Sequence, residues 1–256
     1  MSKNRVIHTQ EEIVRIRRAG QLTAQVRDQI AAAIQPGMTT WDLDQLAGEY
    51  IRATGGRSAF LGYHGYPGNI CISVNEEVIH GIGVPTRIIM PGDIVSVDVG
   101  VEIDGALGDT ATTVAVGEVT PDVQRLLQGT KDALASGIAA ATKGHRVRHI
   151  SAAVEKVANK AKLGIVRDFV GHGCGTSLHE PPEIPNYTSV CSGVELVPGM
   201  VICIEPMFTL GNYSVVVDRA DSWTVRTRDK SFSAHYEHMI LITEDKPEIL
   251  TWQKTM

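Results

Sequence analysis

Apolar residues recur at helical spacing in two segments near the start of the chain. In the first, Thr9–Ile34, a capping-box pair of Thr9 and Glu12 precedes apolar positions repeated every three or four residues. A proline-glycine pair at Pro36 ends this pattern, and a glycine pair ends the second segment, Thr40–Thr54. Two short apolar runs then predict strands, at Asn69–Val74 and Asp93–Val101.

The same order of helix, helix, strand and strand is predicted again later in the chain. The second set of elements lies at Pro121–Thr142, Arg148–Leu163, Val201–Glu205 and Tyr213–Val217. No linker or low-complexity segment separates the two sets, which indicates one domain over residues 1–256.

Two landmarks recur at one offset of 107 residues, which indicates an internal duplication. They are Gly37 with Gly144, and PGDIVSVD at 91–98 with PGMVICIE at 198–205. A proline-glycine turn before an apolar strand is a common signal, so coincidence is the alternative. If residues of about 14–105 are repeated as residues of about 121–212, the chain folds with pseudo-twofold symmetry, and Asp98 and Glu205 hold equivalent places in the two repeats.

Two aspartates flank a predicted hairpin in IVSVDVGVEIDGALGDTATTVAV. A turn at Asp104-Gly105 places Asp98 opposite Ala111, with Asp109 diagonal on the same face. A bulge would instead bring the two aspartates directly opposite each other. Either register leaves the carboxylates within about 8 Å, which is unfavourable unless a cation lies between them. The alternative is that one aspartate lies at a solvated strand end, and for an isolated pair that alternative is favoured.

Two further acids and a histidine strengthen the interpretation as a metal site. Glu205 ends the apolar run VICIE and Glu237 lies in HYEHMILIT, where the alternative is an edge strand with His235 and His238 in water. His172 lies among glycines in GHGCG, which leave its imidazole uncrowded. One imidazole and four carboxylates suit Mn, Fe, Co or Zn and neutralise two divalent charges. The set predicts a two-metal centre that activates water for hydrolysis.

Composition and charge exclude several classes of function. A net charge of -5 provides no basic surface for binding nucleic acid in bulk. No uncharged apolar stretch reaches the roughly 18 residues of a membrane span, and the N-terminus has no apolar signal segment. The cysteines form no C-x-x-C pair, which favours a reduced, cytoplasmic setting.

Five motifs follow one another over nearly the whole chain. They are CISVNEEVIHGIG, the D-x10-D pair of Asp98 and Asp109, GHGCGTSLHEPPEIPNY, GMVICIEPMF and SAHYEHMILIT. In order and approximate spacing they resemble the motifs of type I, bacterial methionine aminopeptidases. The resemblance implies the pita-bread fold, an α/β duplication around a curved, mostly antiparallel sheet. It also implies metal-dependent removal of the initiator methionine from nascent polypeptides, with a small second residue preferred.

The resemblance implies a role for each polar residue at a matching position. The metal ligands it implies are Asp98, Asp109, His172, Glu205 and Glu237, with Asp109 and Glu237 bridging two divalent ions. His80 and His179 match histidines that contact the substrate and support the tetrahedral intermediate, and Glu205 doubles as a proton shuttle. The free N-terminal amine of the substrate would bind one metal, which explains the refusal of internal peptide bonds.

The resemblance also implies a methionine-sized pocket, whose alternative interpretation is ordinary core. The matching positions are Phe60, Tyr63, Tyr66, Cys71, His80, Leu178, His179 and Trp223. Bacterial members often carry Cys in place of Phe60, Phe in place of Leu178, and a proline in place of Gly83. The larger residue at Phe60 and the smaller one at Leu178 roughly offset each other in pocket volume. Methionine specificity therefore stays the hypothesis.

Two other functions remain open at this point. An Xaa-Pro dipeptidase or aminopeptidase on the same fold would use the same ligands, but the short N-terminus argues against it. A non-catalytic pita-bread module that binds peptides would typically lack metal ligands, which this chain keeps. Arg15, Arg17 and Arg18 favour a solvated helix face over a transient contact with the ribosome, and a monomer is expected.

Overall fold

The computed structural model describes residues 5–190 and 192–252 and begins with the two predicted helices. Helix α1 spans Gln10–Ala33 and α2 spans Thr40–Ala53. Both start at a capping box: Thr9 pairs reciprocally with Glu12, as predicted, and Thr39 pairs in the same way with Asp42. In the described part of the chain, none of the helices combines the length and apolar character of a bilayer span.

The strands of the first half are built around one long hairpin. They are β1 (Arg57–Ser58), β2 (Cys71–Val74), β3 (Glu77–Ile79), β4 (Ile94–Ile103) and β5 (Ala106–Ala115), with a short 3-10 helix at Tyr63–Gly65. The order β1-β4-β2 forms one sheet, and β5 pairs with β4. Asp98 pairs with Ala111, so the hairpin has the regular register and no bulge. The turn residues Asp104 and Gly105 both have positive φ, as a two-residue hairpin turn requires.

The second half repeats the helix pair and adds more short strands than the apolar pattern predicts. The helices are α3 (Pro121–Ala140) and α4 (Val147–Ala161). The strands are β6 (Gly164–Ile165), β7 (Gly171–Gly173), β8 (Glu180–Ile184), β9 (Val201–Ile204), β10 (Met207–Thr209), β11 (Val215–Val217), β12 (Val225–Thr227), β13 (Ser233–His235), β14 (His238–Leu241) and β15 (Glu248–Ile249). The largest sheet has the order β15-β14-β9-β7-β8. The paired strands in every described sheet run antiparallel.

Backbone contacts in the two halves repeat at the offset found in the sequence. Gly37 donates its N–H to Ile89 O at 2.8 Å, and Gly144 donates to Leu196 O at 3.0 Å. Isolated bridges recur in the same way, between Thr39 and Ile88 and between Arg146 and Glu195. Corresponding residues of the two sets of contacts are 107 positions apart, so the backbone conformation at these landmarks is the same in both halves.

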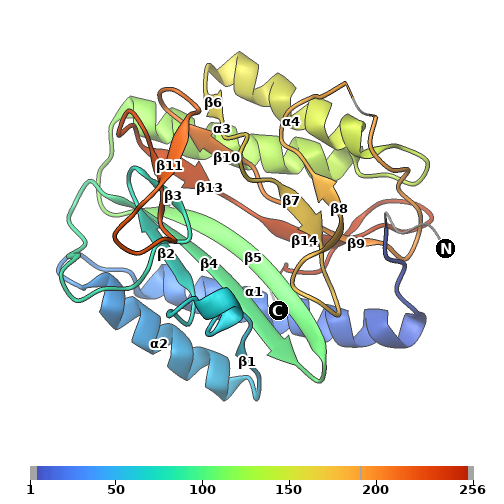
Figure 1. Cartoon of the computed structure of the whole chain (residues 1–256), viewed down its shortest axis with the longest axis horizontal. Coiled ribbons are helices and arrows are strands. Elements are labelled where there is room, and N and C mark those ends of the chain that lie inside the picture. The colour runs from blue at the N-terminus through green and yellow to red at the C-terminus, as the bar shows by residue number, and fades with distance from the viewer. Residues whose placement is uncertain (1–4, 191, 253–256) are drawn as a thin grey trace.

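The two helix pairs lie on opposite sides of the strands, α1 with α2 and α3 with α4 (Figure 1). In the first half, Ile30 of α1 and Leu43 of α2 pack with Val97 and Val99 of β4. In the second half, α3 and α4 contribute Leu126 and Ile150 to a core with Ile202 and Ile204 of β9. Because side chains alternate along a strand, residues between these apolar positions point away from the helices, towards the centre of the molecule.

One alternative from the sequence is wrong. Glu237 does not lie in an edge strand with its neighbours in water, because β14, which it precedes, pairs with both β9 and β15. Glu237 and His235 are each only 2% exposed. Two polar residues so deeply buried next to each other need partners inside the protein.

Candidate active site

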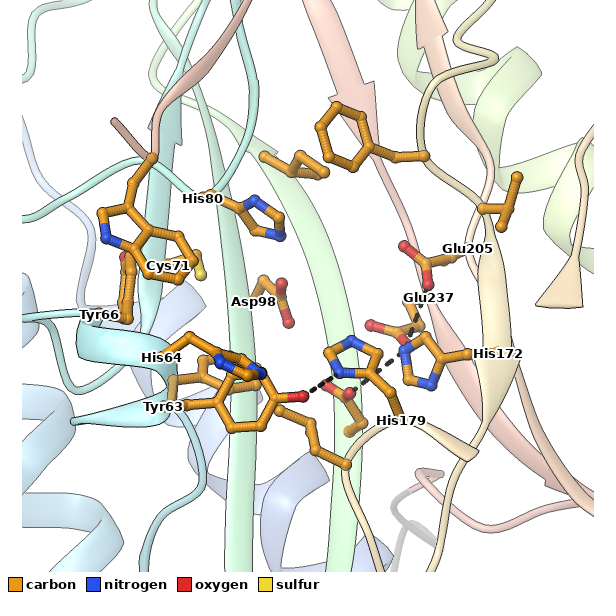
Figure 2. Close-up of a pocket in the computed structure, with 17 residues that line it drawn as sticks. Tyr63, His64, Tyr66, Cys71, His80, Asp98, His172, His179, Glu205 and Glu237 are labelled. Carbon is orange, nitrogen blue, oxygen red and sulfur yellow. Dashed lines mark hydrogen bonds and ion pairs between the residues drawn. The ribbon is translucent and has the colours of Figure 1, made fainter. Parts of the chain in front are cut away.

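A cavity of about 180 Å³ lies at the centre of the molecule, and every residue predicted for the site lines it. Figure 2 shows Tyr63 and Tyr66 on one side of the cavity, Glu205, Glu237 and His172 on the other, and His80 and His179 between them. The lining also includes four residues that were not predicted from the sequence: His64, Ile79, Phe169 and Val170.

The candidate metal ligands come from strands of both halves of the chain. Asp98 lies on β4, Asp109 on β5 and His172 on β7. Glu205 directly follows β9, and Glu237 directly precedes β14. Since strands from both halves meet at the cavity, residues more than a hundred positions apart share one site.

Burial sets the charge state of the acids in the metal-free protein. It raises the pKa of Asp98 to about 7, and the pKa values of Asp109 and Glu237 lie well above their usual range. Neighbouring carboxylates add to the last two shifts, Glu237 acting on Asp109 and Glu205 on Glu237. Like charges in a buried space each disfavour ionisation of the next.

Several of these carboxylates have an oxygen with no partner. Within residues 5–190 and 192–252, nothing hydrogen-bonds to Asp98 Oδ1, Asp109 Oδ1 or Glu237 Oε1, although all three atoms are buried. An unpaired buried acceptor costs about 1–3 kcal/mol, and more if it is charged. Divalent cations would satisfy these oxygens and offset their repulsion, so the residues present fit a metal centre.

His172 is oriented as a metal ligand would be. Its Nδ1 lies 2.9 Å from Gly173 O, so in the tautomer that donates this hydrogen bond the Nε2 lone pair is free. Nε2 lies 3.5 Å from Glu205 Oε1 and 3.8 Å from Asp109 Oδ2. The imidazole therefore presents its free nitrogen to the same space as two of the carboxylates.

Cys203 belongs to this cluster and was missed from the sequence. Ligand atoms of Asp109, His172, Cys203 and Glu237 all lie within 4.8 Å of one another. The signal in the sequence is that Cys203 precedes Glu205 by two positions, which places both side chains on one face of the strand. Burial raises the pKa of the Cys203 thiol well above its usual range, which favours the neutral form beside the acids.

His80 and His179 are held as neutral imidazoles at the edge of the acid cluster. Burial lowers the pKa of each to about 4. The Nδ1 of His179 lies 2.8 Å from the Tyr63 hydroxyl, and its ring centre lies 4.4 Å from that of His172. His80 has a positive φ of 59°, an uncommon conformation for a residue with a side chain.

The aromatic side of the cavity combines residues from three distant segments. Phe60, Tyr66, Cys71 and Leu178 are buried in one apolar cluster, against which Tyr63 and Trp223 pack. Tyr66 is fixed by hydrogen bonds from its hydroxyl to Gly81 O (2.7 Å) and Ile70 O (3.1 Å). The centre of its ring lies 5.2 Å from the centre of the Trp223 ring. Cys71 pairs with Asp98 across the strands, so the apolar wall directly adjoins the acids.

A buried set of carboxylates and a histidine, open to an apolar pocket, defines the class of metal-dependent hydrolases. Comparison with known proteins is more specific, because the model of metallopeptidase family M24 matches residues 14–244. The chain therefore belongs to metallopeptidase family M24.

Similar proteins narrow the relationship further. A methionine aminopeptidase of Clostridium acetobutylicum is 42% identical over 246 residues, covering 96% of this chain and 98% of the relative. The crystal structure of methionine aminopeptidase from Rickettsia prowazekii has a TM-score of 0.94 at 40% identity, covering 97% of this chain and 100% of the other. The resemblance to bacterial methionine aminopeptidases and the expected pita-bread fold are confirmed.

A more distant neighbour shares the fold alone. Prolidase from Pyrococcus furiosus has a TM-score of 0.78 at 22% identity, covering 98% of this chain and 66% of the prolidase. The fold alone therefore does not determine which substrate a peptidase of this architecture cleaves, and substrate specificity must come from the residues of the pocket.

The raised pKa of Asp98 leads to a stability prediction for the metal-free protein. A carboxyl with a folded-state pKa of about 7 and an ordinary unfolded pKa of about 4 destabilises the fold as the pH rises between those values. The substitution Asp98→Asn removes the carboxyl group and with it this loss of stability at higher pH. We expect its free energy of unfolding, relative to the parent, to increase by more than about 1 kcal/mol from about pH 5 to about pH 7.5. Urea unfolding of chelator-treated protein at both pH values measures the change.

The matched control for this measurement is Asp104→Asn at the exposed hairpin turn. The side chain of Asp104 is 58% exposed and pairs only at the surface with Arg18. Its replacement should leave the pH dependence of stability unchanged. An identical pH dependence for Asp98→Asn and the parent would contradict a raised pKa at Asp98.

Proposed function

We propose that this chain removes the N-terminal methionine from polypeptides by metal-dependent hydrolysis, with a small second residue preferred. The observation that carries the proposal is the joining of unpaired, buried carboxylates to an apolar pocket within one cavity. The similar methionine aminopeptidases have the same fold over nearly the full chain. The whole chain, 1–256, would act as a single catalytic domain built from the two repeats.

Two divalent ions would be held by the donor set predicted from the sequence. The residues that would hold them are Asp98, Asp109, His172, Glu205 and Glu237. When bound, such ions supply Lewis acidity and lower the pKa of water. The donor set accepts Mn, Fe, Co or Zn, because availability rather than ligand type decides among ions of this class.

Glu205 is proposed to move the proton in the reaction. Its carboxylate lines the cavity together with the other acids, and its Oε1 lies 3.5 Å from His172 Nε2. A carboxylate in this place can take the proton of the attacking water and return it to the departing amine nitrogen. The Glu205→Gln side chain keeps the shape but cannot accept the proton.

His179 is proposed to stabilise charge on the substrate carbonyl oxygen. In the tautomer with its proton on Nε2, His179 accepts the Tyr63 hydroxyl hydrogen at Nδ1 and has an Nε2–H left to donate. Because burial lowers its pKa to about 4, His179 is neutral at neutral pH and can donate a hydrogen bond without losing its proton. His80 would contact the substrate at its peptide nitrogen.

The apolar wall is proposed to hold the methionine side chain. A cavity wall of Phe60, Tyr66, Leu178 and Trp223 offers a flexible thioether both apolar surface and aromatic edges. The ring of Phe60 packs directly over Gly100 of β4, where an added Cβ would lie 2.5 Å from the ring, so a glycine is needed there for Phe60 to hold its place in the wall. A pocket of fixed depth discriminates by the size of the side chain it buries.

The setting of the reaction is also proposed. Release of the initiator methionine from nascent polypeptides places the enzyme in the cytoplasm, as a monomer making at most transient contact with the ribosome. An Xaa-Pro peptidase is the alternative function, and comparing Met-Ala, Leu-Ala and Phe-Ala peptides with Xaa-Pro peptides discriminates between the two. The prolidase likeness extends only to the fold and does not favour that alternative.

Release of methionine from Met-Ala-Ser tests the proposed function. Chelator-treated protein should be inactive, and titration with Mn, Co or Fe should restore release. Glu205→Gln should lower kcat by about 100-fold or more, because a group that transfers protons contributes 10²–10⁴-fold. Folded wild-type protein that releases no methionine with any of the ions would overturn the proposal.

Tyr63→Phe tests the part played by His179. The substitution removes one hydroxyl and with it the hydrogen bond at His179 Nδ1, so the ring loses its fixed orientation. We expect kcat for Met-Ala-Ser to fall by about 3- to 10-fold with KM within about twofold, from the loss of roughly one hydrogen bond. Tyr50→Phe, at a half-buried tyrosine of α2 outside the cavity, is the control and should leave kcat unchanged. An unchanged kcat in Tyr63→Phe would show that the hydroxyl does not orient His179.

A further inference from the structure

His235 is a buried imidazole that the proposed ligand set does not use. It ends β13, pairs with Met207 of β10 and is 2% exposed. Its backbone is held on both sides by Thr113: the His235 N–H donates to Thr113 Oγ1 at 2.9 Å, and Thr113 Oγ1 donates to His235 O at 2.8 Å. Its position next to the acids is therefore fixed by the sheet.

Both ring nitrogens of His235 lack a hydrogen-bond partner among the described residues. A buried polar atom left unpaired costs about 1–3 kcal/mol. Such a residue can be retained where its polar atom serves the site it faces.

The ring faces Glu205 on the side away from His172. His235 Nε2 lies 3.5 Å from Glu205 Oε2, while His172 Nε2 lies 3.5 Å from Glu205 Oε1. The two oxygens of one carboxylate thus have different imidazole neighbours. His172 keeps its Nε2 free of hydrogen, because its Nδ1 is directed at Gly173 O, whereas His235 has no such constraint and can carry its hydrogen on Nε2.

The chain places His235 and Glu237 close together. His235 ends β13, and Glu237 comes two positions later, directly before β14. The backbone N–H of Glu237 is held by Ala111 O at 3.0 Å, directly opposite Asp98 in the hairpin. The His235 ring lies beside the acids, 3.5 Å from Glu205 Oε2 at its Nε2, and is not among the described residues that line the cavity.

We infer that His235 is a positioning residue for Glu205: its Nε2, 3.5 Å from Glu205 Oε2 in this structure, donates a hydrogen bond to that oxygen when Glu205 takes up its position as a ligand, so that Oε1 stays directed at the side of His172. The inference rests on the proposed role of Glu205 as ligand and proton carrier. A carboxylate with one oxygen held from behind presents a single oxygen to an ion, and it loses less conformational freedom on binding. The imidazole makes no contact with the substrate and takes no part in bond breaking.

Two substitutions separate the hydrogen bond from the volume of the ring. His235→Leu fills the site without a donor, whereas His235→Gln keeps an N–H at the place of Nε2. Calorimetric titration of the metal-free proteins with Mn²⁺ should show the tighter site weakened by about 10- to 100-fold in His235→Leu and restored to within about threefold in His235→Gln. With Met-Ala-Ser at saturating Mn²⁺, His235→Leu should lower kcat about tenfold and change KM less than about twofold.

A double-mutant cycle tests whether the effect passes through Glu205. In a Glu205→Ala background the acceptor is absent, so adding His235→Leu should weaken Mn²⁺ binding by less than about twofold further. Equal losses in both backgrounds would overturn the inference, as would a wild-type affinity in His235→Leu or a loss that His235→Gln does not restore.

A third variant keeps the test decisive if His235→Leu does not fold. His235→Asn places its N–H near the position of Nδ1, out of reach of Glu205, so it should behave as the donor-free variant while remaining polar. If His235→Asn binds Mn²⁺ as tightly as His235→Gln, the inference is wrong. The Mn²⁺ titration does not involve substrate. Failure of wild-type protein to release methionine would therefore refute the proposed function, while the effect of the His235 variants on Mn²⁺ affinity could still be interpreted.

Discussion

The repulsion between buried carboxylates at the centre of the molecule is the interaction on which the rest of the structure depends. Asp98, Asp109, Glu205 and Glu237 occupy one space lined by strands, and three of them keep an oxygen with no partner in the described chain. Nothing in an apolar sheet compensates for such a cluster. Divalent cations do so at little structural cost, since the side chains are already gathered around the space that the ions would fill.

The fold accommodates this concentration of charge because the two faces of the strands differ. One face packs against the helices, and the other carries the acids. Val97 and Val99 of β4 pack under α1 and α2, and Asp98 between them points inwards. Ile202 and Ile204 of β9 pack under α3 and α4, and Glu205 follows at the end of that strand. Duplication therefore brings two such half-sites together, and the free energy of apolar packing in each half stabilises the acids between them.

Much of this could be predicted from local patterns, and the rest depends on contacts across the fold. Capping residues, the Asp104-Gly105 turn and the repeat at 107 residues predict the helices, the hairpin register and the equivalence of Asp98 with Glu205. The three-residue strands β10, β12 and β13 carry too few alternations for a periodic signal. Cys203 and His235 were missed because burial beside the acids is a property of the assembled sheet. The edge-strand alternative for Glu237 is wrong for the same reason, because the pairing of β14 with both β9 and β15 arises only in the assembled sheet.

Metal-dependent stabilisation tests the central claim most directly. The midpoint of thermal unfolding of chelator-treated protein should rise with added Mn²⁺, because an ion that binds only the folded state stabilises it by mass action. Asp109→Asn, which weakens both proposed ion sites, should remove most of that rise while leaving the metal-free protein folded. The account predicts a midpoint that increases with Mn²⁺ in the parent only. A midpoint independent of Mn²⁺, Co²⁺ and Fe²⁺, or an equal rise in Asp109→Asn, would contradict it.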